Sequence, residues 1–162
     1  MEEIITFFII VILSFLSVAS LTHIKRWFTK IEILLLFLFT SYFCQNMFYT
    51  ITSPYDRLRV VEEHLPFWSV RLQYGVVFAI TLLWVIAIYR SKSPLMIKLI
   101  ATFSWIVFGI LVEKSFLILG VLSTHSKSWY PSLDMFFEML VILLTFWFSN
   151  FLRTILRKES II

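Results

Sequence analysis

Charged side chains inside otherwise apolar segments are the residues of this sequence best suited to chemistry. Glu113 and Lys114 stand side by side in the segment 94–122, and Glu138 stands in the segment 133–156. An ionisable side chain at the centre of a membrane helix costs about 2.5–3.5 kcal/mol, so each one needs a physical reason. A carboxylate there can take up a proton or bind a cation, whereas an ion pair between Lys114 and either glutamate would be structural.

Hydrogen-bonding side chains also follow one face of the segment 33–51. They recur at positions i, i+3, i+4 and i+7 of a helix, as Tyr42, Gln45, Asn46 and Tyr49. Such a face can hold a polar solute. It can equally bond to neighbouring helices, where each hydrogen bond contributes about 0.6–2 kcal/mol. The spacing leaves both interpretations open.

The expected depth of these groups places them in one half of a membrane. With a rise of about 1.5 Å per residue, Gln45 and Asn46 lie roughly 8–9 Å below the outer boundary, Glu113 roughly 14 Å and Glu138 roughly 5 Å. Asp134 falls in the first turn of its helix, where a carboxylate complements the helix dipole. We expect the second, fourth and fifth spans to surround a polar pocket that opens outward, with the first and third spans outside them.

The motifs of several protein classes are missing from the sequence. Cys44 is the only cysteine, the three histidines are scattered, and no Gly-rich phosphate loop, G-x-S-x-G or H-E-x-x-H motif occurs. We therefore expect no catalytic residues, no metal site and no cofactor. The net charge is +4, but no solvated basic run carries interleaved aromatic residues, so we expect no nucleic-acid partner.

The elements that must position these residues are membrane helices. Of the 162 residues, 60% are hydrophobic and 15% are charged, whereas soluble domains carry about 45–50% apolar and about 25% charged residues. A membrane-spanning helix needs about 20 apolar residues. The sequence predicts an all-α fold, a single transmembrane domain over 1–162 built as a bundle of five helices. The expected spans are 4–21, 33–51, 72–89, 94–122 and 133–156.

The loop between the second and third spans carries a helical pattern of its own. Leu58, Val61 and Leu65 recur at i, i+3 and i+7 after a capped start, and Pro66 would end the helix. We expect 54–65 to form a short amphipathic helix on the outer membrane surface, followed by Phe67 and Trp68 as interface anchors. The alternative is an irregular solvated loop. The three glycines and four prolines predict a plain bundle of unbroken spans.

The distribution of basic residues predicts the orientation. Nine Lys and Arg residues lie in the loops and ends that we assign to the inside, and four lie in those that we assign to the outside. The inner residues are Lys25, Arg26, Lys30, Arg90, Lys92, Lys98, Arg153, Arg157 and Lys158, and the outer ones are Arg57, Arg59, Arg71 and Lys127. Cytoplasmic loops carry the excess of basic residues. We therefore expect a multi-pass protein of the cell membrane with its N-terminus outside and its C-terminus in the cytoplasm.

Three functions are compatible with this pattern. The first is a non-enzymatic component that binds membrane lipids, a membrane-protein partner or a second copy of the chain through the outward-facing pocket. The second is a carrier or channel subunit in which Glu113 or Glu138 binds a proton or a cation. The third is a membrane enzyme that acts on a lipid with one of these glutamates as general acid or base. We expect the first.

Overall fold

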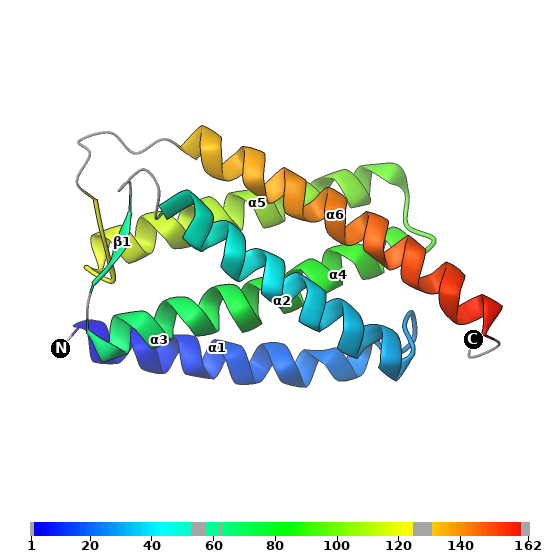
Figure 1. Ribbon diagram of the computed structural model, residues 1–162, viewed down its shortest axis with the longest axis horizontal. Helices are drawn as coiled ribbons and strands as arrows, with labels where there is room; N and C mark the ends of the chain where they lie inside the picture. The colour runs from blue at the N-terminus through cyan, green and yellow to red at the C-terminus, as the bar shows by residue number, and fades with distance from the viewer. Residues whose placement is uncertain (1, 53–57, 62, 125–130, 160–162) are drawn as a thin grey trace.

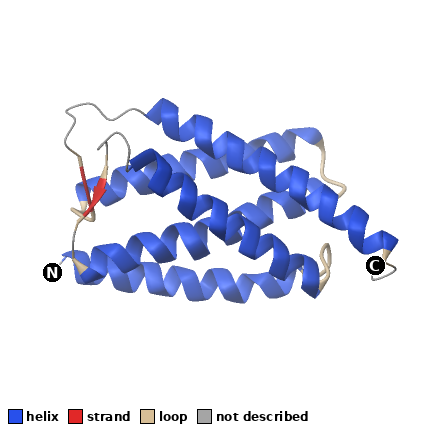
Figure 2. Ribbon diagram, in the orientation of Figure 1, coloured by secondary structure: helices blue, strands red, loops and turns tan. Residues whose placement is uncertain are grey.

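The computed structural model describes residues 2–52, 58–61, 63–124 and 131–159. Within these residues the chain is helical apart from short turns and a two-stranded ribbon (Figure 2). Five helical segments are long and apolar enough to cross a membrane, which confirms the prediction of an all-α chain with five helices of this length and composition. The beginning of the first helix and the end of the last lie at opposite ends of the bundle (Figure 1).

The helices differ in length from the expected spans, mostly by extension into the flanking polar residues. The helices are α1 (Glu2–Ile24), α2 (Lys30–Thr52), α3 (His64–Leu72), α4 (Phe78–Arg90), α5 (Leu95–Ile118) and α6 (Pro131–Lys158). A π-helical turn, η1 (Gln73–Val77), joins α3 to α4, so that these three elements form one span.

The third span is the central helix of the bundle, so the prediction that it lies outside the others is wrong. Two thirds (67%) of its most apolar stretch is buried, against 17–28% in the other four spans. It packs against α1, α2, α5 and α6. Small side chains explain this close approach, because Ala79 and Ala87 are completely buried at its helix contacts. An almost uniformly apolar segment has no polar face from which its position could have been read.

The third span also starts earlier than expected, at His64 rather than at residue 72. Pro66, which was expected to end a helix, lies in the first turn of α3. Proline is tolerated there because the first N–H groups of a helix have no acceptor within it. Phe67 and Trp68, expected as anchors after a separate helix, are exposed on the surface of α3.

The expected amphipathic helix over 54–65 is wrong where the structure describes that segment. Arg59–Val60 is a strand, β1, which pairs antiparallel with β2 (Leu122–Ser123). The amide of Val61 continues this ribbon by donating to the carbonyl of Val121 at 3.2 Å. Residues 53–57 and 62 lie outside the described part of the chain. Consecutive β-branched residues favour the extended form, and Leu58 is buried inside the bundle instead of lying on a membrane surface.

A π-helical turn lies within the third span, which still runs as one continuous helix from His64 to Arg90, as the sequence predicts. The amide of Phe78 donates to the carbonyl of Gln73, five residues earlier. Such turns are rare and often occur at functional sites. Gly75 lies within this turn, and a Cβ atom there would collide with the amide end of Gln45 on α2. The missing side chain therefore lets Gln45 pack directly on the backbone of η1.

The end of α5 is fixed by a left-handed glycine. Gly120 has φ of 69°, and the amides of Gly120 and Val121 donate to the carbonyls of Leu117 and Phe116 at 3.4 and 2.9 Å. This is the hydrogen-bond pattern of a Schellman cap. The helix therefore ends at Ile118 rather than at residue 122, and a Cβ atom at Gly120 would have no described atom within 4 Å.

We expect Gly120→Ala to lower the free energy of unfolding by about 1–2 kcal/mol, because the left-handed conformation brings a Cβ atom too close to the backbone. Thermal unfolding in detergent measures the change, with Ser104→Ala, at an exposed position of α5, as the control. A midpoint for Gly120→Ala equal to that of the control would contradict this account of the cap.

Candidate functional site

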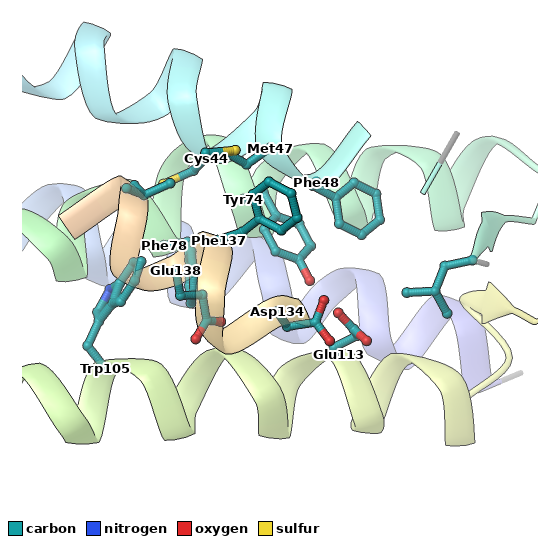
Figure 3. A pocket seen from close by; sticks show the side chains of 12 residues that line it. Cys44, Met47, Phe48, Tyr74, Phe78, Trp105, Glu113, Asp134, Phe137 and Glu138 are labelled. Carbon is teal, nitrogen blue, oxygen red and sulfur yellow. The ribbon is translucent and has the colours of Figure 1, made fainter. Parts of the chain in front are cut away.

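A small cavity lies between α2, the third span, α5 and α6, near the β1–β2 ribbon (Figure 3). Its volume for water-sized contents is about 40 Å³. A single water needs roughly 10–15 Å³ on this scale, so about three water molecules fit. The described residues that line it are Cys44, Met47, Phe48, Leu58, Tyr74, Phe78, Trp105, Glu113, Asp134, Phe137, Glu138 and Val141.

Three carboxylates face this cavity. Glu113 on α5 and Asp134 on α6 are only 6% and 5% exposed. Figure 3 shows their carboxylates directed toward each other, and Glu138 lies one helical turn after Asp134 on the same face of α6. Both residues are close enough to Glu138 to interact with it electrostatically. Like charges at this range repel one another, which disfavours the ionised form of Glu138.

The position of Glu138 depends on Gly109 of α5. A Cβ atom at residue 109 would collide with Oε1 of Glu138 and would lie 2.6 Å from Cζ of Phe78. Gly109 therefore lies at the contact of α5 with α6 and α4. The other carboxylate oxygen of Glu138, Oε2, is buried and has no hydrogen-bond partner among the described residues.

Aromatic rings form the wall of the cavity around these carboxylates. Tyr74 stacks on Phe48 with ring centroids 4.4 Å apart, and Phe78 packs on Trp105 at 4.2 Å. The indole of Trp105 is fixed because its Nε1 donates to Thr81 Oγ1 at 3.1 Å. Aromatic faces are compatible with a cation and exclude bulk water.

The cavity also contains a phenol and a thiol. Tyr74 is close enough to Cys44 and to all three carboxylates for electrostatic interaction, and Cys44 interacts in the same way with Glu138. Cys44 lies on α2, which gives the cavity a sulfur atom on the side opposite α5 (Figure 3). Five titratable groups from four spans therefore share one small space.

Only some of the site residues that the sequence predicts line the cavity. Glu113 and Glu138 line the cavity, whereas Lys114 is exposed on α5 and does not. The polar face of α2 does not line it either. Tyr42 is 65% exposed, and Asn46 is exposed and donates from Nδ2 to the Tyr42 carbonyl at 2.8 Å.

The other two residues of that face contact neighbouring side chains. Gln45 is half-buried against Gly75, and its Nε2 donates to Ser41 Oγ at 3.5 Å. Tyr49 is half-buried with its ring 5.5 Å from the guanidinium of Arg71. The neighbouring face of α2 contributes Cys44, Met47 and Phe48 to the cavity instead.

Sequence reasoning missed two polar residues of the site. Asp134 was assigned to the helix dipole, although its i, i+4 spacing to Glu138 placed both on one face of α6. Tyr74 carried a weaker signal, as a lone polar aromatic residue next to Gly75 in an apolar segment. Its position at the centre of the bundle follows from the central position of the third span.

The charge of the cavity favours cations. Among the residues that the structure describes, its lining includes three carboxylates and no Lys, Arg or His. The described carboxylates, cysteine and histidines do not form a group of three or more arranged to hold a metal ion.

The chain matches no protein-family model, no curated protein and no solved structure.

We expect Gly109→Ala to lower the free energy of unfolding by about 1–3 kcal/mol, since the added methyl group overpacks the contact with Glu138 and Phe78. Gly75→Ala is the matched comparison. It should cost less, because only the flexible amide end of Gln45 must move. Chemical unfolding in mixed micelles measures both variants.

A double variant tests the cause of that loss. Glu138→Ala removes the side chain that the new methyl group meets, so Gly109→Ala should cost less in the Glu138→Ala background than alone. Equal costs in the two backgrounds would show that Gly109 does not make room for Glu138.

Proposed function

We propose that this chain is a multi-pass protein of the cell membrane that binds a proton or a small cation at Glu138, as a subunit of a carrier or channel. The observation that carries the proposal is the buried oxygen of Glu138. It has no hydrogen-bond partner among the described residues and lies in a cavity with two further carboxylates.

The ionised form of Glu138 is the costly form in this environment. Burying an unpaired carboxylate costs several kcal/mol even after the protein relaxes. A proton removes this cost by neutralising the group, and a small cation removes it by pairing with it. The negative potential of Glu113 and Asp134 adds to the attraction for either one.

The size of the cavity favours the smallest ligands. A space for about three waters admits a proton delivered along water, or a partly hydrated monovalent cation. Ligand sites for larger molecules have about 300–1,000 Å³. The aromatic wall limits further hydration of the bound ion.

The outer surface of the bundle favours contact with membrane lipids or with another membrane protein. Many large apolar side chains are exposed on the described outer surface of the bundle, such as Phe15, Trp147 and Ile118. Exposed apolar helices suit lipid tails or the helices of another membrane protein. A docking role for an outer amphipathic helix has lost its basis, because Leu58 is buried and the chain after it is extended. A second copy of the chain could complete the path of the ion, since five helices are few for a carrier.

We expect the β1–β2 end of the bundle to face outward. In a Cys44→Ala background, a cysteine at Ser123 should react with an impermeant maleimide added outside intact cells, and one at Lys92 should react only after lysis. The basis is the excess of basic residues at the Lys92 end. The reverse labelling pattern would invert the orientation.

We expect Glu138→Gln to lower proton uptake into proteoliposomes at least tenfold, because a glutamine side chain cannot exchange a proton. A pH-sensitive dye inside the vesicles reports uptake after a pH step, with the membrane potential clamped. Parallel runs with Na⁺ and K⁺ gradients test the cation form of the proposal.

The matched control is Glu159→Gln, which makes the same change at an exposed position after α6. It should leave uptake unchanged. Proton, Na⁺ and K⁺ fluxes of Glu138→Gln that all equal those of a correctly folded wild type would rule out Glu138 as the binding group.

A further inference from the structure

A second buried polar centre lies at the end of the bundle opposite the β1–β2 ribbon, where α2 begins and α4 ends (Figure 1). Arg90 pairs with Glu32 at 2.7 Å between Nη1 and Oε1. Its Nη2 donates to the carbonyl and the hydroxyl of Ser149 at 3.0 and 2.8 Å. Its Nη1 also reaches the carbonyl of Trp27 at 3.4 Å. One guanidinium thus joins α2, α4, α6 and the α1–α2 turn.

The local sequence explains why Glu32 is held there. Thr29 and Glu32 form a capping box at the start of α2. The amide of Thr29 donates to Glu32 Oε2 at 2.8 Å, and the amide of Glu32 donates to Thr29 Oγ1 at 3.2 Å. One carboxylate oxygen therefore caps the helix while the other binds Arg90.

These groups are enclosed by apolar packing. The side chains of Arg90 and Glu32 are only 10% and 3% exposed, and the Phe28 ring lies 4.2 Å from the guanidinium carbon. A buried apolar cluster lies next to them; its members are Ile24, Phe28, Leu36, Leu83, Ile86, Ala87, Leu152 and Leu156. The described helices are therefore closed at this end, whereas the cavity lies near the other.

We propose that the Glu32–Arg90–Ser149 network is a lock that closes this end of the bundle to ions, an inference that rests on the proposed cation site at Glu138. A buried ion pair is seldom the most stable way to fill a core, because apolar side chains of similar size often do as well or better. An ion pair that can separate is suited to an end of the bundle that has to open. Arg90 Nε has no hydrogen-bond partner among the described residues, so the network is not fully satisfied.

The helices of the lock are also those of the cavity. The α2 helix carries Glu32 and Cys44, the third span carries Arg90 and Tyr74, and α6 carries Ser149 and Glu138. Half-buried Glu138 and buried Ser149 lie on one face of α6, roughly 16 Å apart along a helix with a rise of about 1.5 Å per residue. A tilt of α6 caused by ion binding at Glu138 would therefore move Ser149 relative to Arg90.

The native Cys44 provides the test, since it lines the cavity and is the only cysteine of the chain. Proteoliposomes of uniform orientation are treated with a small, impermeant, cationic methanethiosulfonate from the side of the α4–α5 turn. We expect Glu32→Gln to raise the rate of Cys44 modification from this side at least tenfold over wild type. Ser149→Ala keeps the ion pair and should give a smaller rise.

Lys92→Gln is the matched control, because it removes an exposed charge at the same end. It should leave the rate at the wild-type value. Rates from this side that are unchanged in both Glu32→Gln and Ser149→Ala would overturn the lock, and so would wild-type modification that is already as fast as in Glu32→Gln. Labelling of Cys44 does not require transport. Fluxes that do not depend on Glu138 would therefore refute the cation site, and the labelling rates would still test the lock. Unchanged labelling with a Glu138-dependent flux would refute the lock alone.

Discussion

The energy of a charged side chain in an apolar bundle is the constraint on which this structure depends. An ionised group removed from water needs a counter-charge, hydrogen bonds or a proton. Arg90 satisfies this need within the chain, through Glu32, Ser149 and the Trp27 carbonyl. Glu138 does not, because one of its oxygens is buried without a described partner. Among the described residues, the two buried charges therefore differ, because Arg90 has a counter-charge within the chain and Glu138 Oε2 has no hydrogen-bond partner.

The third span connects the two charged regions. Its small residues allow four helices to approach it, and its π-helical turn lies at the level where Tyr74 and Phe78 meet the cavity. At the other end of this span, Arg90 donates to the Trp27 carbonyl in the α1–α2 turn and to the Ser149 carbonyl on α6. A central helix that carries both centres explains how a change at one site could reach the other. The glycines at positions 75 and 109 let the polar side chains of α2 and α6 approach α3–α4 and α5.

Part of the site was predictable, because some of its chemistry depends only on residue type and spacing. The cost of Glu113 and Glu138 in apolar segments identified them as site candidates, and both line the cavity. The face with Tyr42 and Asn46 does not line the cavity, and the Asn46 amide bonds instead to the carbonyl four residues earlier. Arg90 was counted as a loop residue because its burial comes from α2 and α6, which are distant in the sequence.

The sequence alone determined that the chain forms five long apolar helices, because helix length and hydropathy depend on neighbouring residues. Only the tertiary structure decided which helix lies at the centre, which carboxylates share a cavity and which charge is paired. These properties depend on which helix faces meet. That choice rests on close contacts such as Gly109 with Glu138 and Phe78, and on the ribbon that ties residue 60 to residue 122. Such contacts join residues far apart in the chain, so no local pattern specifies them.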